Sequence, residues 1–172
     1  MRVFLHNKTH LHWPGGSCRT AIGTGGLIPA SRKVEGDGAT PIGSYAFRRV
    51  LYRKDRVVMP TTKLPCRAIQ KDDGWCDAPN DLAYNRPVRL PYPASAEQLF
   101  RQDHLYDILV VLGHNDMPPV PGLGSAIFLH LARPDFTATR GCLALQETDL
   151  REILRQVDAS SLLLLDQDAA AL

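Results

Sequence analysis

The stretch that decides the fold is 127-IFLHLARPDFTATRGCLAL-145. A first apolar run reaches His130, a polar segment follows, and a second apolar run begins at Cys142. Short apolar runs separated by turn-forming residues are typical of buried β-strands. The stretch therefore predicts two adjacent antiparallel strands joined by the loop 133–141. In that arrangement an imidazole at the end of one strand faces a thiol at the start of the next.

Most of the remaining chain repeats this pattern of short apolar runs broken by glycine, proline and polar residues. We expect a strand at each such run. The expected strands are 2–6, 20–28, 44–52, 106–114, 125–132, 142–145 and 161–166. The pattern predicts a mainly β fold, a β-sandwich with few and short helices.

Two segments are expected to be helical. In 95–102, Ser95 and Gln98 form a capping-box pattern at the start of the segment. In 148–158, Thr148 suits the N-cap, and apolar residues recur at intervals of three and four. The second helix is expected to pack against the strands rather than to take part in chemistry.

Two long proline-rich segments stand out between the strands. Residues 60–94 contain six prolines together with a tryptophan and two tyrosines, and 114–125 contains three more prolines. Loops of this length in a compact domain usually carry function, and aromatic residues argue against disorder. We expect both loops to overhang one site.

Composition places the chain among soluble single-domain proteins. It has 172 residues, of which 44% are hydrophobic and 22% charged, so one domain over 1–172 is expected. The net charge of +2, without a basic run, argues against a nucleic-acid partner. No stretch approaches the roughly 18 apolar residues of a membrane span. Residues 1–12 lack the apolar segment of a signal peptide.

The cysteines do not suggest a metal site. Cys18, Cys66, Cys76 and Cys142 include no C-x-x-C pair, and His130 has no companion at ligand spacing. No metal or organic cofactor is therefore expected. Disulfide formation by Cys18, or between Cys66 and Cys76, is left open, since free buried thiols fit the pattern equally well.

The pairing of His130 with Cys142 suits nucleophilic catalysis. A thiolate is the reactive form of cysteine, and a neighbouring imidazole accepts the thiol proton. Gly141 permits close approach of the backbone, and the N–H groups of Arg140, Gly141 and Cys142 are candidate oxyanion donors. The alternative is coincidence, because the chain contains four cysteines and six histidines.

Two blocks resemble the active-site segments of the YkuD-type L,D-transpeptidases. His130 followed by 139-TRGCL-143 is similar to the family signature of a histidine, a loop and Ser/Thr-x-Gly-Cys. Upstream, 33-KVEGDGATPIGSYAF-47 is similar to a family segment in which a Gly-rich turn leads to Thr-Pro-x-Gly and a strand. The blocks occur in the family's order, and the resemblance covers about residues 20–165.

The resemblance implies a β-sandwich fold and a reaction on peptidoglycan stem peptides. His130 would activate Cys142, and the thiolate would attack the carbonyl of an L-to-D bond at diaminopimelate. A thioester would form, the terminal D-amino acid would leave, and an amine acceptor would resolve the thioester into a cross-link.

The details resemble one branch of the family more than the common form. Leu131, Arg140 and Ala144 depart from the common residues, and the loop between histidine and cysteine is short. The blocks 73–91 and 118–130 look like those of a compact alpha/beta-proteobacterial group. For that group, 1,3 cross-links from L-Ala to diaminopimelate are assigned, which favours 1,3 over 3,3 linkage here.

Other residues are candidate substrate contacts. Arginine binds carboxylates with two parallel hydrogen bonds, so residues that flank the site are candidate clamps; the alternative is a solvated loop charge. Aromatic and polar residues of the long loops are candidate walls, or simply loop packing. The candidates are Arg133, Arg140, His114, Asn115, Trp75, Asp77 and Tyr84, with Asn85 beside them.

Two alternatives to cross-linking are kept. Water in place of the amine would make the protein an L,D-carboxypeptidase that trims tetrapeptides to tripeptides, and the missing signal peptide favours this. A non-catalytic wall-binding module is the third reading, which the intact cysteine and histidine disfavour. A cross-linking function predicts a periplasmic location, whereas the missing signal peptide favours the cytoplasm.

Overall fold

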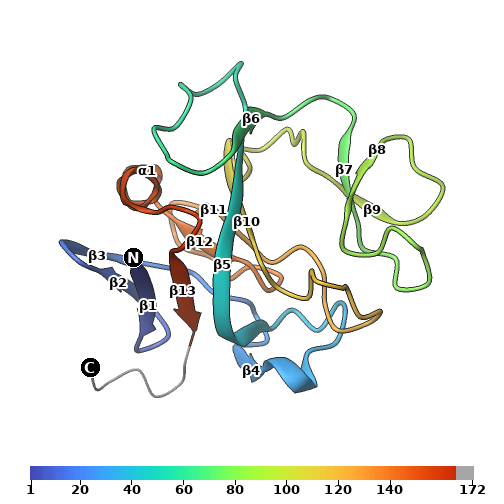
Figure 1. Ribbon diagram of the computed structural model, residues 1–172, viewed down its shortest axis with the longest axis horizontal. Coiled ribbons are helices and arrows are strands. Elements are labelled where there is room, and N and C mark those ends of the chain that lie inside the picture. The colour runs from blue at the N-terminus through green and yellow to red at the C-terminus, as the bar shows by residue number, and fades with distance from the viewer. Residues whose placement is uncertain (166–172) are drawn as a thin grey trace.

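The computed structural model describes residues 1–165 and is mainly β (Figure 1). The strands are β1 (Arg2–His6), β2 (His10–Trp13), β3 (Gly16–Arg19), β4 (Leu27–Pro29), β5 (Thr40–Tyr52), β6 (Cys66–Ala68), β7 (Asp73–Cys76), β8 (Pro87–Arg89), β9 (Ala96–Gln98), β10 (Ile108–Leu112), β11 (Phe128–Leu131), β12 (Leu143–Leu145) and β13 (Leu162–Leu165). The helices are η1, a 3₁₀ turn over Ala30–Arg32, and α1 over Glu147–Gln156. The expected mainly β class is confirmed. Among the described residues, no helix is long and apolar enough to cross a membrane.

The long strand β5 organises the main sheet. Its first half pairs with β13, and its second half pairs with β10. The order across the sheet is β12-β11-β10-β5-β13-β1-β2-β3, with β4 and β6 also paired to β5. In Figure 1, β5 runs through the middle, with β1, β2, β3 and β13 on one side and β7, β8 and β9 on the other. One strand of 13 residues thus links both halves of the sheet.

The core lies between the two halves and under α1. Apolar residues of β1 and β2 pack in one cluster with those of β10, β11 and β12. The helix contributes Leu150, Ile153 and Leu154, all completely buried, to the same cluster. These three fall on one face of the helix, which is why the expected helix at 148–158 forms here. It starts at Glu147, and its N-cap is Gln146 rather than Thr148.

A second, smaller core lies on the opposite face of β10 and β11. It contains Leu109, Val111 and Phe128 of these strands, together with Trp75 of β7. β7 and β8, which lie in the proline-rich region 60–94, form a three-stranded sheet with β9. The small sheet lies beyond β10 in Figure 1, and its Trp75 packs against one face of the main sheet.

The expectation of antiparallel strands at the opening stretch was wrong. β11 and β12 are parallel neighbours, with His130 opposite Ala144. The segment between the strands bridges to the N-terminal part of the chain, where Gly23 pairs with Thr139. Because this segment leaves the sheet edge and returns, it makes the crossover that parallel strands require.

Two other expectations failed for local reasons. The segment 95–102 is not a helix, since β9 pairs with β7 and a strand ladder replaces the short capped turn. The segment 20–28 forms only isolated bridges at Ala21 and Gly23 before the short strand β4. The strand expected at 161–166 is confirmed as β13, and position 166 lies outside the described residues.

Candidate active site

Cys142 and His130 project from the same face of the sheet. The register places Leu129 opposite Leu143 and His130 opposite Ala144, so Cys142 lies beside Phe128. Paired residues of neighbouring strands share a face, and residues two apart on one strand share it as well. The thiol and the imidazole therefore occupy one face, displaced along the strands by two residues. Both face the smaller core, against which Cys142 packs.

The thiol of Cys142 is held by the backbone of the neighbouring strand. Its Sγ donates to the carbonyl oxygen of Ala126 at 3.1 Å and accepts from the N–H of Phe128 at 3.4 Å. Burial, followed by the negative charge of Glu97, raises the pKa of Cys142 to about 12. The resting residue is thus a protonated thiol pointing at Ala126.

The ring of His130 is oriented by its own strand. Nδ1 lies 2.9 Å from the carbonyl oxygen of Leu131, an acceptor, so Nδ1 carries the proton and Nε2 is the basic nitrogen. The side chain is buried, and burial lowers the pKa of His130 to about 4. The ring of Tyr106 packs edge-on against it at 5.3 Å between centroids.

Two threonines fix the loop that carries the nucleophile. Thr40, completely buried at the start of β5, accepts from the N–H of Gly23 and donates to the carbonyl of Gly141, both at 2.8 Å. Thr139 accepts from the N–H of Gly141 at 3.1 Å and donates to the carbonyl of Cys142 at 2.6 Å. The two threonine motifs of the sequence therefore meet at one loop.

Glycine is required where this loop touches its neighbours. Gly141 has φ +126°, and a Cβ there would lie 2.9 Å from the carbonyl oxygen of Ala39. A Cβ on Gly23 would lie 2.1 Å from the carbonyl oxygen of Gly38. Side chains at these positions would push the loop away from Thr40, so the close approach depends on both glycines.

The arginines expected at the site lie beside it in solvent. Arg133 follows β11 and Arg140 precedes Gly141, and both are exposed. Within residues 1–165, neither forms an ion pair. Their guanidinium groups are available to a carboxylate ligand.

The aromatic residues expected to form a substrate wall make internal contacts. Trp75 is buried, packs edge-on against Phe128 at 5.2 Å and donates from Nε1 to Asn85 at 2.9 Å. Tyr84 is also buried, and its hydroxyl donates to Glu35 at 2.5 Å. Both side chains hold the long loop 60–94 against the rest of the chain. Trp75 packs against β11, the strand that carries His130.

The expected polar contacts from the second loop also face inward. His114 is buried, and its Nε2 lies 3.1 Å from the carbonyl oxygen of Leu123. Burial lowers the pKa of His114. The side chain of Asn115 bonds to the backbone of Val120 and Gly124, all at 2.8–2.9 Å. These residues brace the loop 114–125 from within.

Sequence reasoning missed a carboxylate close to the site. Glu97 of β9 accepts a hydrogen bond from Tyr106, which packs against His130. Asp77, which was expected as a substrate contact, directly follows β7, and its Oδ1 is buried without a partner among the described residues. Glu97 lies in the segment 95–102, which was expected to be a helix. The sequence therefore gave no indication that Glu97 would lie on a strand next to the site.

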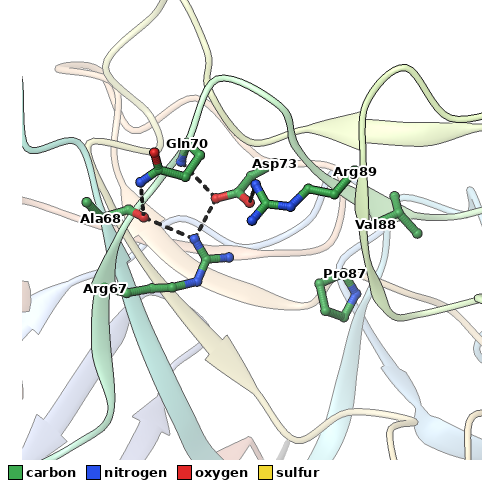
Figure 2. A pocket seen from close by; sticks show the side chains of 7 residues that line it. All are labelled: Arg67, Ala68, Gln70, Asp73, Pro87, Val88 and Arg89. Carbon is green, nitrogen blue, oxygen red and sulfur yellow. Dashed lines mark hydrogen bonds and ion pairs between the residues drawn. The ribbon is translucent and has the colours of Figure 1, made fainter.

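Two cavities border the strands β7 and β8 of the small sheet. One of about 180 Å³ is bordered by Trp75 and Phe128, on the side of β5 and β10. Another of about 550 Å³ lies between Arg67 and Arg89. Figure 2 shows that Asp73 holds both arginines, Arg67 at 2.6 Å and Arg89 at 3.1 Å. Neither cavity is lined by Cys142 or His130.

All four cysteines are free thiols. The open question about Cys66 and Cys76 is thereby resolved, since both are present as thiols and burial raises the pKa of each. Cys18 is buried in the main core, where burial raises its pKa to about 12.

A comparison with protein-family models gives a match that covers most of the chain. The family model described as the YkuD L,D-transpeptidase catalytic domain matches residues 1–163. Comparisons with curated proteins and with solved structures find no match to this chain.

Proposed function

The chain belongs to the YkuD family of L,D-transpeptidases, and on this premise we propose that Cys142 is its nucleophile and His130 its general base. The family acts on peptidoglycan through a cysteine. The observation that carries the assignment is the shared face of Cys142 and His130 on the parallel pair β11 and β12.

The first step transfers the thiol proton to His130. Nε2 is the acceptor, because Nδ1 is committed to the carbonyl of Leu131. The thiol must first turn away from Ala126. The thiol pKa of about 12 and the imidazole pKa of about 4 both disfavour a standing thiolate–imidazolium pair. Proton transfer and attack on the substrate carbonyl are therefore coupled.

Acylation then exchanges one bond for another. Sγ forms a thioester with the carbonyl carbon of the L-centre of diaminopimelate, and the amide bond to the terminal D-amino acid breaks. The protonated His130 returns its proton to the leaving amine. An acceptor amine attacks the thioester, the C–S bond breaks, and the thiol is restored.

The backbone at the nucleophile supplies the oxyanion donors of this proposal. The N–H of Gly141 is bonded to Thr139, so we assign the role to the N–H groups of Arg140 and Cys142. Gly141 keeps a supporting role, because its backbone geometry sets the direction of both neighbours. The exposed side chains of Arg133 and Arg140 are assigned to the free carboxylates of the stem peptide.

For the cross-link we propose the 1,3 type, which joins L-Ala to diaminopimelate. The proposal is supported by the resemblance of 73–91 and 118–130 to a group with this linkage. Because the cross-linked wall lies in the periplasm, we propose that the protein works there.

The products of a defined reaction test this function. The purified protein is incubated with tetrapeptide muropeptides, and the products are identified by mass spectrometry. We expect dimers in which L-Ala of one stem is joined to diaminopimelate of the other. Tripeptide dimers formed with loss of D-Ala would replace the 1,3 assignment by 3,3. Monomeric tripeptide alone would make the protein a carboxypeptidase and refute the cross-linking proposal.

A further inference from the structure

Glu97 lies one side chain away from the proposed general base. The hydroxyl of Tyr106 donates to Glu97 Oε1 at 2.6 Å, and the ring of Tyr106 contacts His130 and Phe128 at 5.3 and 6.0 Å. Glu97 pairs with Trp75 in the small sheet, and Trp75 packs on Phe128 beside Cys142. The carboxylate is thus fixed from two sides at the edge of the site.

The charge of Glu97 is only partly offset by its neighbours Arg101 and Arg140. Arg101 Nη1 lies 3.8 Å from Oε1, but Arg101 makes two shorter bonds to Asp103, at 2.7 and 2.8 Å. The side chain of Glu97 is 28% exposed, so a ligand can reach it. Its second oxygen, Oε2, makes no hydrogen bond or ion pair within residues 1–165.

A carboxylate at this place works against the nucleophile. The charge of Glu97 raises the pKa of Cys142 and so penalises the thiolate. Burial raises the pKa of Glu97 itself, which makes it a stronger base than an exposed glutamate. Its position therefore has no benefit for acylation, but it suits a cation that arrives after the thioester has formed.

We propose that Glu97 binds the ammonium group of the acyl acceptor and removes one proton from it. This role rests on the proposed transpeptidase function and specifies how its second half selects an amine over water. Ammonium has no lone pair and cannot attack a carbonyl, so the acceptor must lose a proton at the site.

The step balances as follows. The acceptor R–NH3⁺ passes one proton to the carboxylate of Glu97, which becomes a carboxylic acid. The neutral amine attacks the thioester carbonyl of Cys142 and forms the new C–N bond. His130 takes the second proton from nitrogen, the C–S bond breaks, and His130 returns that proton to the thiolate. Glu97 releases its proton to water. Hydrolysis needs only His130.

The test is how the thioester divides between amine and water. Wild type and Glu97→Gln are given a tetrapeptide donor with either of two acceptors: a peptide with an N-terminal ammonium, or hydroxylamine, which is uncharged at neutral pH. Mass spectrometry gives the ratio of amide, or hydroxamate, to hydrolysed tripeptide. This ratio does not depend on how fast the thioester forms. Glu152→Gln, which alters an exposed carboxylate on α1, is the matched control.

We expect Glu97→Gln to lower the ratio for the ammonium acceptor by roughly 100-fold, within the usual range of general base catalysis. The hydroxylamine ratio should stay within about twofold of wild type, and Glu152→Gln should match wild type with both acceptors. An unchanged ammonium ratio, or equal losses with both acceptors, would overturn the inference while leaving the transpeptidase function standing. A wild type that forms no amide with any acceptor would refute the proposed function instead.

Two further variants guard against misfolding. Glu97→Asp keeps the charge but withdraws it by one methylene, and we expect an intermediate loss of the ammonium ratio. Tyr106→Phe frees Glu97 from its hydrogen bond and should also lower that ratio. If both variants are folded and keep the wild-type ratio, the inference is wrong.

Discussion

Replacing Thr40 by valine should loosen the nucleophile loop from the rest of the fold. Valine has nearly the same shape as threonine but no hydroxyl. The change removes the bonds to the N–H of Gly23 and the carbonyl of Gly141, each 2.8 Å long and buried. Both backbone groups lose a partner away from water, at about 1–3 kcal/mol each. We therefore expect the free energy of unfolding to fall by roughly 2–6 kcal/mol.

Thr40→Ser is the matched control, because it keeps the hydroxyl and removes one buried methyl group. It should cost about 1 kcal/mol. Urea unfolding followed by tryptophan fluorescence measures both variants, since Trp13 and Trp75 are buried. The folded valine variant should also form the thioester about 10- to 100-fold more slowly, because Gly141 precedes the nucleophile. Equal stability of the two variants would refute the linking role of Thr40.

Two further substitutions test the surroundings of the site. The pKa of His130 is about 4 in the folded chain and 6.5 in the unfolded chain, so the unfolded chain binds more protons between these values. The free energy of unfolding of wild type should therefore fall by roughly 3 kcal/mol between pH 6.5 and 4 because of this group, and that of His130→Gln should not. If urea unfolding shows the same pH dependence of this free energy for both proteins, the reasoning is wrong. Asn85 is buried and bonds to Trp75 and the backbone of Ala126, so Asn85→Ala should cost about 3–5 kcal/mol. A urea midpoint equal to that of the exposed Asn80→Ala would show that these bonds add nothing.

The strands of the core could be predicted because their pattern is local. The segments 44–52, 106–114 and 125–132 each contain a strand of the structure, and each strand has at least one buried face. The direction of β12 could not be predicted, since it depends on the path of 133–141 past Gly23. The segment 95–102 was misread because its capping box is a local signal, whereas its strand depends on β7.

The site could be predicted in part. Cys142 and His130 were singled out by their residue types and by the family resemblance, and the structure places both on one face, while their catalytic roles stay a prediction. The roles of Trp75, Tyr84 and Asn115 were harder to predict, because polar and aromatic residues in a loop suit a ligand and an internal brace equally. Here they bond to Asn85, Glu35 and the loop backbone. Thr40 was known only as part of a motif, and its contact with Gly141 spans 101 residues of sequence.

The central claim is that Cys142 forms a thioester with the stem peptide. Intact-mass spectrometry of the protein mixed with a tetrapeptide donor, without an acceptor and quenched in acid, tests it directly. We expect an adduct with the mass of the tripeptide acyl group, located at Cys142 by peptide mapping and absent from Cys142→Ala. An adduct on Cys18, Cys66 or Cys76, or product formation by Cys142→Ala, would contradict the account.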